Sequence, residues 1–218
     1  MKKENTIKSY SSQELEKVIH YLDGPLRIAL KENEAVILHA DLKEGDCVLD
    51  IGCGTGFLSL IAAQKVNASG KVIGMDSRQE MLDVMQKKAE KRGLDHIIKP
   101  CLGDACSLEF SDNCFDAVVM SYVLHENSER TEVILREIYR VLKPGKKLVI
   151  SDFIKVADPE RNKEIEAWHK GTDPESDADE VHLKFSLSDY ISLFEKNNFK
   201  DVKGEVWIEF QGIVEGRK

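Results

Sequence analysis

The stretch DIGCGTGFLS at residues 50–59 decides the predicted fold of this chain. Gly52, Gly54 and Gly56 stand in it within five residues, directly after an apolar run at residues 47–51 that is typical of a buried strand. Glycines in such a loop let the backbone turn sharply and approach a ligand closely. Because open α/β sheets bind ligands outside the carboxyl ends of their strands, the sequence predicts a ligand site at this loop.

Short apolar runs alternate with amphipathic helical patterns between residues 46 and 153. Parallel neighbouring strands need a crossover connection, so this alternation predicts a parallel sheet with helices on both faces, which is a doubly wound α/β fold. The expected strands are 47–51, 71–76, 97–102, 115–121 and 146–153, and the expected helices are 57–66, 79–92 and 129–142, with a turn at 143–145.

The N-terminal residues are predicted to form a helical cap. Ser11 with Glu14 three residues later is a capping box, and apolar residues follow it at helical spacing. Gly24-Pro25 interrupts this pattern, which then continues to residue 40. We therefore assign residues 1–45 to the cap and residues 46–218 to the main domain.

The order of elements changes after residue 154. Residues 155–184 are polar and acidic, and a capping box formed by Ser186 and Asp189 then begins a helix. Two strands follow at 202–208 and 210–215, and their short connection forces them to run antiparallel. The whole sheet is expected to have seven mostly parallel strands with an antiparallel last strand, and residues 155–184 are expected to form a lid or substrate insertion.

Composition limits the partners of the protein. The 218 residues carry 31 Lys and Arg against 39 Asp and Glu, a formal charge of −8, which repels nucleic acid and anionic membranes. No apolar run approaches the ~18 residues that a membrane span needs. We expect a cytoplasmic protein that binds neither nucleic acid nor membrane.

The sequence predicts no metal centre. Five cysteines are an odd number and include no Cys-x-x-Cys pair, so free thiols are expected. His169 and His182 flank an acidic tract at residues 173–180. A bound cation is one interpretation of this arrangement, and a solvated acidic surface is the one we favour.

Three classes of ligand compete for the glycine loop. A Walker-type phosphate site requires Gly-Lys-Ser/Thr, whereas Gly56 is followed by Phe57. The dinucleotide pattern G-x-G-x-x-G requires its third glycine at position 57 when counted from Gly52. Asp76 ends the second strand, and a carboxylate there accepts hydrogen bonds from both hydroxyls of an unphosphorylated ribose. The pattern therefore favours a nucleoside ligand.

Five motifs occur in an order that resembles a known family: VLDIGCGTG (48–56), VIGMD (72–76), LGDA (102–105), FDAVVMSYVLHE (115–126) and REIYRVLKPG (136–145). They are similar to those of class I S-adenosylmethionine-dependent methyltransferases of the type 11 group, which includes ubiquinone and menaquinone C-methyltransferases. The resemblance implies a Rossmann-like fold, with residues 46–218 as the cofactor-binding methyltransferase domain.

The same resemblance implies the cofactor site. The glycine loop would lie under the methionine part of S-adenosylmethionine, with Asp50 fixing the loop. Asp76 would bind the ribose, Asp104 with Ala105 would meet the adenine, and Ser121 with Tyr122 would border the methyl group. The full set of implied cofactor residues is Asp50, Gly52, Cys53, Gly54, Gly56, Asp76, Ser77, Asp104, Ala105 and Ser121.

His125 and Tyr122 are the candidate catalytic residues. They follow the fourth strand, and a histidine there is suited to accept a proton from a hydroxyl acceptor. The other interpretation of His125 is a packed loop residue that orients the site, because amine, thiol and carbanion acceptors need no base.

We therefore predict an enzyme, an S-adenosylmethionine-dependent methyltransferase with a small-molecule acceptor. A non-catalytic binding module of the same fold, with a regulatory or partner-binding role, is the alternative, because binding motifs alone do no chemistry. A nicotinamide oxidoreductase is disfavoured by Phe57. The assembly is left open, with a homodimer as one option.

Overall fold

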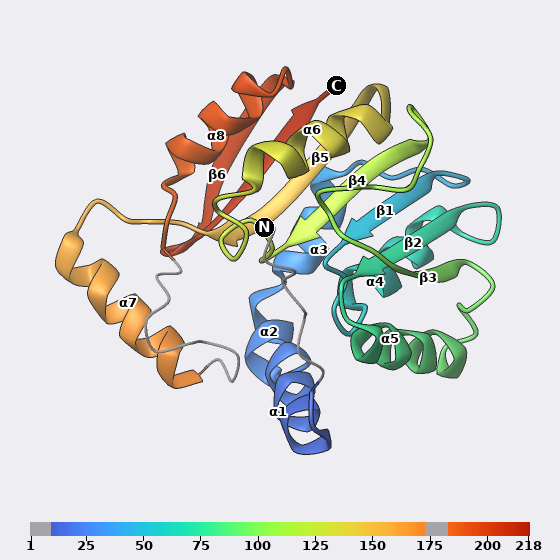
Figure 1. Cartoon of the computed structure of the whole chain (residues 1–218), viewed down its shortest axis with the longest axis horizontal. Helices are drawn as coiled ribbons and strands as arrows, with labels where there is room; N and C mark the ends of the chain where they lie inside the picture. Colours follow the sequence, from blue (N-terminus) through green and yellow to red (C-terminus); the bar gives the residue numbers. More distant parts are fainter. Residues whose placement is uncertain (1–9, 173–182) are drawn as a thin grey trace, which may run out of the picture.

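The computed structural model describes residues 10–172 and 183–218, and one seven-stranded sheet forms its centre (Figure 1). The strand order is β3-β2-β1-β4-β5-β7-β6, with the first five strands parallel and β7 antiparallel to both of its neighbours. The order reverses between β1 and β4, which confirms the predicted doubly wound fold. The strands are β1 (Cys47–Ile51), β2 (Lys71–Asp76), β3 (Ile98–Leu102), β4 (Phe115–Ser121), β5 (Leu142–Phe153), β6 (Lys200–Ile208) and β7 (Gln211–Arg217).

Helices cover both faces of the sheet. Side chains of neighbouring strand residues point to opposite faces, so Val48 packs in one apolar cluster with α3, α4 and α5 while Leu49 packs in the other with α6 and α8. In Figure 1, α6 and α8 lie in front of the sheet and α3 and α4 lie behind it. Within the described residues, no helix is both long and apolar enough to cross a bilayer. The helices are α1 (Ser12–Leu22), α2 (Pro25–Leu30), α3 (Glu32–His39), α4 (Phe57–Val66), α5 (Gln79–Lys91), α6 (Thr131–Val141), α7 (Pro159–Thr172) and α8 (Leu187–Lys196).

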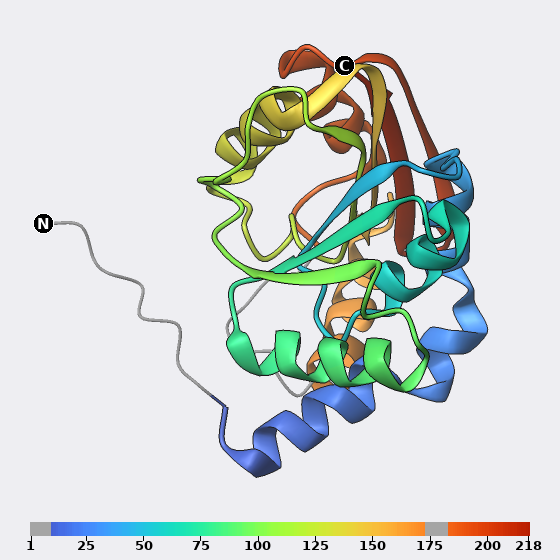
Figure 2. The same cartoon turned by 90° about the vertical axis from the view of Figure 1, so that its right-hand side faces the viewer.

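The N-terminal cap consists of α1, α2 and α3. The predicted capping box is present, since Glu14 N donates to Ser11 Oγ at 3.3 Å and Ser11 N donates to Glu14 Oε2 at 2.7 Å. Asp23, between α1 and α2, accepts from Thr55 Oγ1 at 2.7 Å and pairs with Lys88 of α5. The cap is thus tied to the glycine loop and to α5, below which α1 runs in Figure 2. The division at residue 45 stays a prediction.

Residues 155–184 contain a helix that was not predicted from the sequence. Helix α7 is polar along most of its length, and its buried Ile165 packs with Phe153 and Leu183 in a small apolar cluster of its own. His169 is buried on the same helix, with its ring centroid 4.6 Å from that of Phe153. His182 and the acidic tract lie outside the described residues. The role of this segment as a lid stays a prediction.

Strand β5 begins earlier than predicted. Its pairing with β4 jumps from Phe115–Leu142 to Ala117–Lys147, so β5 carries a long irregularity where a turn was expected at residues 143–145. Gly145, with φ +75°, lies inside it. The backbone of this segment is held by a hydrogen bond from Gly145 N to Lys218 O at 2.9 Å, a contact across a long stretch of sequence that local turn signals do not reveal.

Gly56 connects the glycine loop to α4 and is expected to tolerate no side chain. Its φ is +85°, and a Cβ there would lie 2.3 Å from Met85 Cγ. Gly56→Ala is expected to lower the free energy of unfolding by about 2 kcal/mol through backbone strain and displacement of Met85. Urea unfolding monitored by circular dichroism measures this change.

Gly93 provides the matched control for Gly56. Its φ is +66°, but no heavy atom lies within 4 Å of the position that a Cβ would take. Gly93→Ala is therefore expected to cost only the backbone strain, about 1 kcal/mol. Equal losses in the two variants would contradict the tight contact between Gly56 and Met85.

Candidate active site

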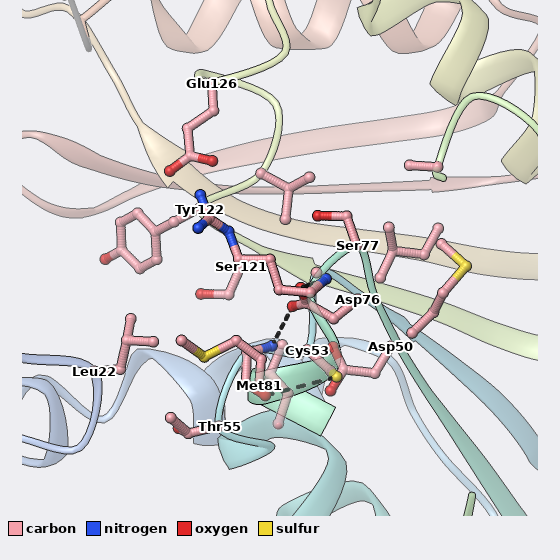
Figure 3. Close-up of a pocket in the computed structure, with 18 of the residues that line it drawn as sticks. Leu22, Asp50, Cys53, Thr55, Asp76, Ser77, Met81, Ser121, Tyr122 and Glu126 are labelled. Atoms are coloured by element: carbon pink, nitrogen blue, oxygen red, sulfur yellow. Dashed lines mark hydrogen bonds between the residues drawn. The ribbon is translucent and has the colours of Figure 1, made fainter. Parts of the chain in front are cut away.

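A pocket of about 690 Å³ lies at the carboxyl ends of β1, β2 and β4, where the strand order reverses. The cap closes one side of it with Tyr21, Leu22 and Arg27. In Figure 3, Tyr122 and Glu126 lie toward one end of the pocket, while the other end holds residues of the glycine loop. The structure brings together all but one of the predicted site residues as its lining: Asp50, Gly52, Cys53, Gly54, Asp76, Ser77, Asp104, Ala105, Ser121, Tyr122 and His125.

Gly56 is the predicted cofactor residue that does not line this pocket. It faces Met85 and shapes the entry into α4 instead. Gly52 and Gly54 do line the pocket, with φ values of +66° and +50°. A Cβ on Gly52 would lie 2.4 Å from Val123 Cγ2, so a glycine is required for the loop to pass under the residues that follow β4.

Asp76 ties the glycine loop to the end of β2. Its Oδ2 accepts from Gly54 N at 2.8 Å (Figure 3). Its Oδ1 accepts from Arg78 N at 3.0 Å. Burial raises the pKa of Asp76 above its ordinary value, although the amides of Gly54 and Arg78 oppose this shift. Each carboxylate oxygen has a further lone pair, so Asp76 holds the loop and still has acceptor capacity for a ligand.

Asp50 contacts the helix that follows the glycine loop. Its Oδ2 accepts from Ser59 Oγ of α4 at 2.5 Å, and its role in fixing the loop stays a prediction. Asp50 is only 1% exposed, and burial raises its pKa from 3.8 to about 7 in spite of the Ser59 hydrogen bond. It therefore anchors the first turns of α4 beneath the pocket.

Asp50 is expected to make the stability of the protein fall with rising pH. Between pH 4 and about pH 7 the native state binds more protons than the unfolded chain, because only the native carboxyl keeps its proton there. Asp50→Asn keeps an acceptor for Ser59 and removes the titration. The variant is expected to be about 2 kcal/mol more stable than the wild type at pH 8, and equally stable at pH 4. Urea unfolding at both pH values measures the difference, and a gain that does not depend on pH would contradict it.

Asp104 forms an ion pair with Arg130 that was not predicted from the sequence. Both carboxylate oxygens accept from Arg130 Nη2, at 2.7 and 2.5 Å, and Oδ1 also accepts from Cys106 N at 2.9 Å. Burial raises the pKa of Asp104, but the Cys106 amide and Arg130 outweigh it and the net pKa is lowered. Arg130 lies at the N-cap of α6 and makes no capping bond, and a cation at that helix end is unusual. An arginine at the start of a predicted helix is the sequence signal that could have revealed the Asp104–Arg130 ion pair.

His125 forms a buried pair with Asp152. The distance from His125 Nδ1 to Asp152 Oδ1 is 2.7 Å, and the histidine is 3% exposed. Asp152 Oδ2 accepts from the amides of Leu124 and His125 at 2.9 and 3.2 Å. An aspartate on Nδ1 assigns the proton to that nitrogen and leaves Nε2 as a proton acceptor. Asp152 was not among the predicted site residues, although an acidic residue near the end of an apolar strand is a signal for a site residue.

Tyr122 and Ser121 complete the end of β4. The ring of Tyr122 lies 4.6 Å from that of Phe153, and its hydroxyl donates to Glu32 of the cap at 2.5 Å. Burial raises the pKa of Tyr122 well above its ordinary value, so its hydroxyl stays protonated and suits a positioning role better than proton transfer. Ser121 Oγ is buried and has no hydrogen-bond partner among the described residues. It is therefore available to a ligand.

Comparisons with known proteins agree with this geometry. A family model described as a methyltransferase domain matches residues 42–202. A demethylmenaquinone methyltransferase of Lactobacillus johnsonii is 41% identical over 118 residues, which are 54% of this chain and 48% of that protein. The chloroplastic 2-phytyl-1,4-beta-naphthoquinone methyltransferase of Arabidopsis thaliana is 42% identical over 115 residues, 52% of this chain and 44% of that one.

A solved structure matches the whole fold. The crystal structure of a SAM dependent methyltransferase from Aquifex aeolicus has a TM-score of 0.70 and 25% identity, and the match covers 95% of this chain and 98% of that one. The chain spans about half the length of the two curated relatives. Since the family model covers the glycine loop, the acids at the strand ends and the five parallel strands of the sheet, the chain belongs to the methyltransferase domain family.

Proposed function

We propose that this protein is an S-adenosylmethionine-dependent methyltransferase with a small-molecule acceptor. The observation that carries the proposal is the hydrogen bond between Gly54 N and Asp76 Oδ2. It joins the glycine loop after β1 to an acid at the end of β2, beside the point between β1 and β4 where the strand order reverses. The proposed position of the cofactor has its ribose on Asp76 and its methionine part along the glycine loop.

The residues present fit this cofactor. The pocket volume of about 690 Å³ lies within the range of roughly 300–1,000 Å³ that small-molecule sites have. Asp76 retains acceptor capacity for ribose hydroxyls, and Ser121 Oγ is a buried polar atom that the described protein residues leave without a partner. When bound, S-adenosylmethionine supplies a methyl group activated on a sulfonium. The chain itself then has to hold the acceptor and exclude water, and positioning contributes roughly 7–11 kcal/mol.

The acceptor is proposed to be a quinone-type molecule in its reduced, dihydroxy form. The two curated relatives are named for demethylmenaquinone and for 2-phytyl-1,4-beta-naphthoquinone. A methyl group on sulfur is electrophilic, so the acceptor must supply an electron pair, which the hydroquinone does far better than the quinone. Aromatic rings of Tyr122, His125 and Phe153 line this end of the pocket, with centroids 4.6–6.4 Å apart, and suit a flat acceptor.

His125 is the residue proposed to accept the hydroxyl proton of such an acceptor. Its Nδ1 is the nitrogen that meets Asp152, so Nε2 is the one that takes up the proton. Asp152 stabilises the imidazolium that this transfer creates, and Glu126 Oε1, 3.8 Å from Nε2, adds a second negative charge beside it. Tyr122 is proposed to position His125 and the acceptor through its ring, whose centroid lies 6.4 Å from that of His125.

A product assay tests the proposed function. The protein is incubated anaerobically with S-adenosylmethionine and a reduced, unmethylated naphthoquinone, and both products are followed by mass spectrometry. The expected result is S-adenosylhomocysteine in equal amount to the methylated acceptor. If the cofactor binds but neither product forms with any hydroxylated acceptor, the non-catalytic binding module is the better description.

Cytoplasmic location and the lack of a nucleic-acid partner remain predictions, and a homodimer remains one option for the assembly. The formal charge of −8 supports the second of these. Sedimentation of the purified protein measures its assembly directly.

A further inference from the structure

Arg27 is a pocket residue that has no role in the function proposed so far. It lies on α2, its side chain is 12% exposed, and it lines the pocket on the cap side. Its Cζ lies 4.0 Å from the centroid of the Tyr122 ring, and its Nη2 lies 3.3 Å from Glu32 Oε1. The guanidinium is therefore held between a carboxylate and an aromatic face.

Most of the donors of Arg27 are not used by these contacts. A guanidinium has five N–H donors, and charge-assisted hydrogen bonds are usually about 2.7–2.9 Å long, shorter than the 3.3 Å to Glu32. Nε is buried and has no hydrogen-bond partner among the described residues. A buried donor without a partner is costly, and in a pocket lining it indicates a ligand that supplies the acceptor.

The surroundings of Arg27 hold it in one place. Glu32 is fully buried, and its other oxygen accepts from Tyr122 at 2.5 Å. Tyr122 in turn packs against Phe153, with ring centroids 4.6 Å apart. A guanidinium fixed in this way needs little reorganisation to meet an anionic oxygen, which is the condition for strong electrostatic stabilisation.

The contacts of Tyr122 place Arg27 near His125. Both residues contact this tyrosine, His125 with ring centroids 6.4 Å apart and Arg27 over the ring face. Arg27 and His125 also both line the pocket, so its acceptor end carries a cation and a proton acceptor that contact the same tyrosine.

We propose that Arg27 binds the ionised oxygen of an aromatic hydroxyl acceptor and so selects for acceptors that form phenolates. This inference rests on the proposed function and adds to it the residue that binds the ionised oxygen of the acceptor. The acceptor O–H proton passes to His125 Nε2, and the oxyanion faces the Arg27 N–H groups. The electron pair of the phenolate, on oxygen or on a conjugated ring carbon, forms the new bond to the methyl carbon. The C–S pair remains on sulfur. When oxygen is methylated, the proton leaves from His125 to solvent. When a ring carbon is methylated, that carbon loses its own proton as the ring becomes aromatic again, and the oxygen regains a proton from His125.

A spectroscopic experiment without turnover tests this role. The probe is 4-nitrophenol, which absorbs visible light only when it is ionised, bound to protein saturated with S-adenosylhomocysteine. The bound probe is expected to ionise about 1 to 3 pH units lower in the wild type than in Arg27→Met, because an opposite charge at contact distance stabilises the phenolate. Arg27→Lys is expected to recover part of this shift.

Two further variants separate the role from folding. Arg27→Met leaves Glu32 buried without a cation, so Arg27→Met with Glu32→Gln tests the same loss in a neutral pocket wall. In this double variant, the bound 4-nitrophenol is expected to ionise at the same higher pH as in Arg27→Met. Arg136→Met removes an equal charge from an exposed position of α6 and is expected to leave the shift unchanged.

The outcomes are distinct from a failure of the proposed function. Calorimetric affinity for S-adenosylhomocysteine is expected to be within threefold of wild type in every Arg27 variant. An unshifted probe in the wild type, or a double variant that keeps the wild-type shift, would overturn the role of Arg27 and leave it as the structural partner of Glu32. Failure of the wild type to bind S-adenosylhomocysteine would instead overturn the proposed function.

Discussion

His125→Asn is expected to lower kcat/KM for a hydroxylated acceptor about 10³-fold, within the 10²–10⁴ range of general acid–base catalysis. Asparagine fits the space of the imidazole and donates to Asp152 as Nδ1 does, so the packing of the loop is kept while the proton acceptor is lost. The measurement is steady-state production of S-adenosylhomocysteine. Addition of free imidazole is expected to restore part of the rate.

Asp152→Asn is the companion variant for His125. Its amide group donates to Nδ1, which moves the imidazole proton to Nε2 and removes the acceptor without removing the ring. A loss about as large as that of His125→Asn is expected. If both variants kept the wild-type kcat/KM and acceptor affinity, His125 would be the packed loop residue of the alternative interpretation.

Asp76→Ala is expected to weaken binding of S-adenosylhomocysteine by about 3 kcal/mol, roughly 150-fold. Hydrogen bonds to charged groups contribute about 1.5–3 kcal/mol each, and this variant loses the proposed ribose contacts together with the anchor of Gly54 N. Isothermal titration calorimetry gives the affinity directly.

Asp83→Ala is the matched control for Asp76. Asp83 is an exposed acid of α5 whose carboxylate accepts from Gln79 on the same helix at 2.8 Å. Its removal is expected to leave the affinity unchanged. Equal affinities of wild type, Asp76→Ala and Asp83→Ala would place the nucleoside elsewhere in the molecule.

The sheet could be predicted from sequence because its signals are local. Strands β1, β2 and β4 have the predicted bounds, since each is a short apolar run bounded by turn residues. Helix α4 also has its predicted bounds, from Phe57 to Val66. Helix α7 was missed because its apolar residues are too few to give a helical period, and its contacts in the cluster with Phe153 and Leu183 are made outside the helix itself.

The site could be predicted only as far as it depends on the strand ends. Asp76 and the glycines are tied to consecutive strands, so their meeting follows from the topology. The partners of His125 and Tyr122 lie 27 and 90 residues away in sequence. No local pattern joins Asp152 or Glu32 to these residues, and the same holds for Arg27.

Calorimetric titration of the purified wild-type protein with S-adenosylhomocysteine, S-adenosylmethionine and NAD decides whether the pocket is a site for an adenosyl cofactor. Binding of both adenosyl ligands at one site per chain, with no heat from NAD, is the expected result, because the loop lacks the third glycine of a dinucleotide site. A folded protein that binds neither adenosyl ligand, or that binds NAD in their place, would contradict the assignment of the pocket.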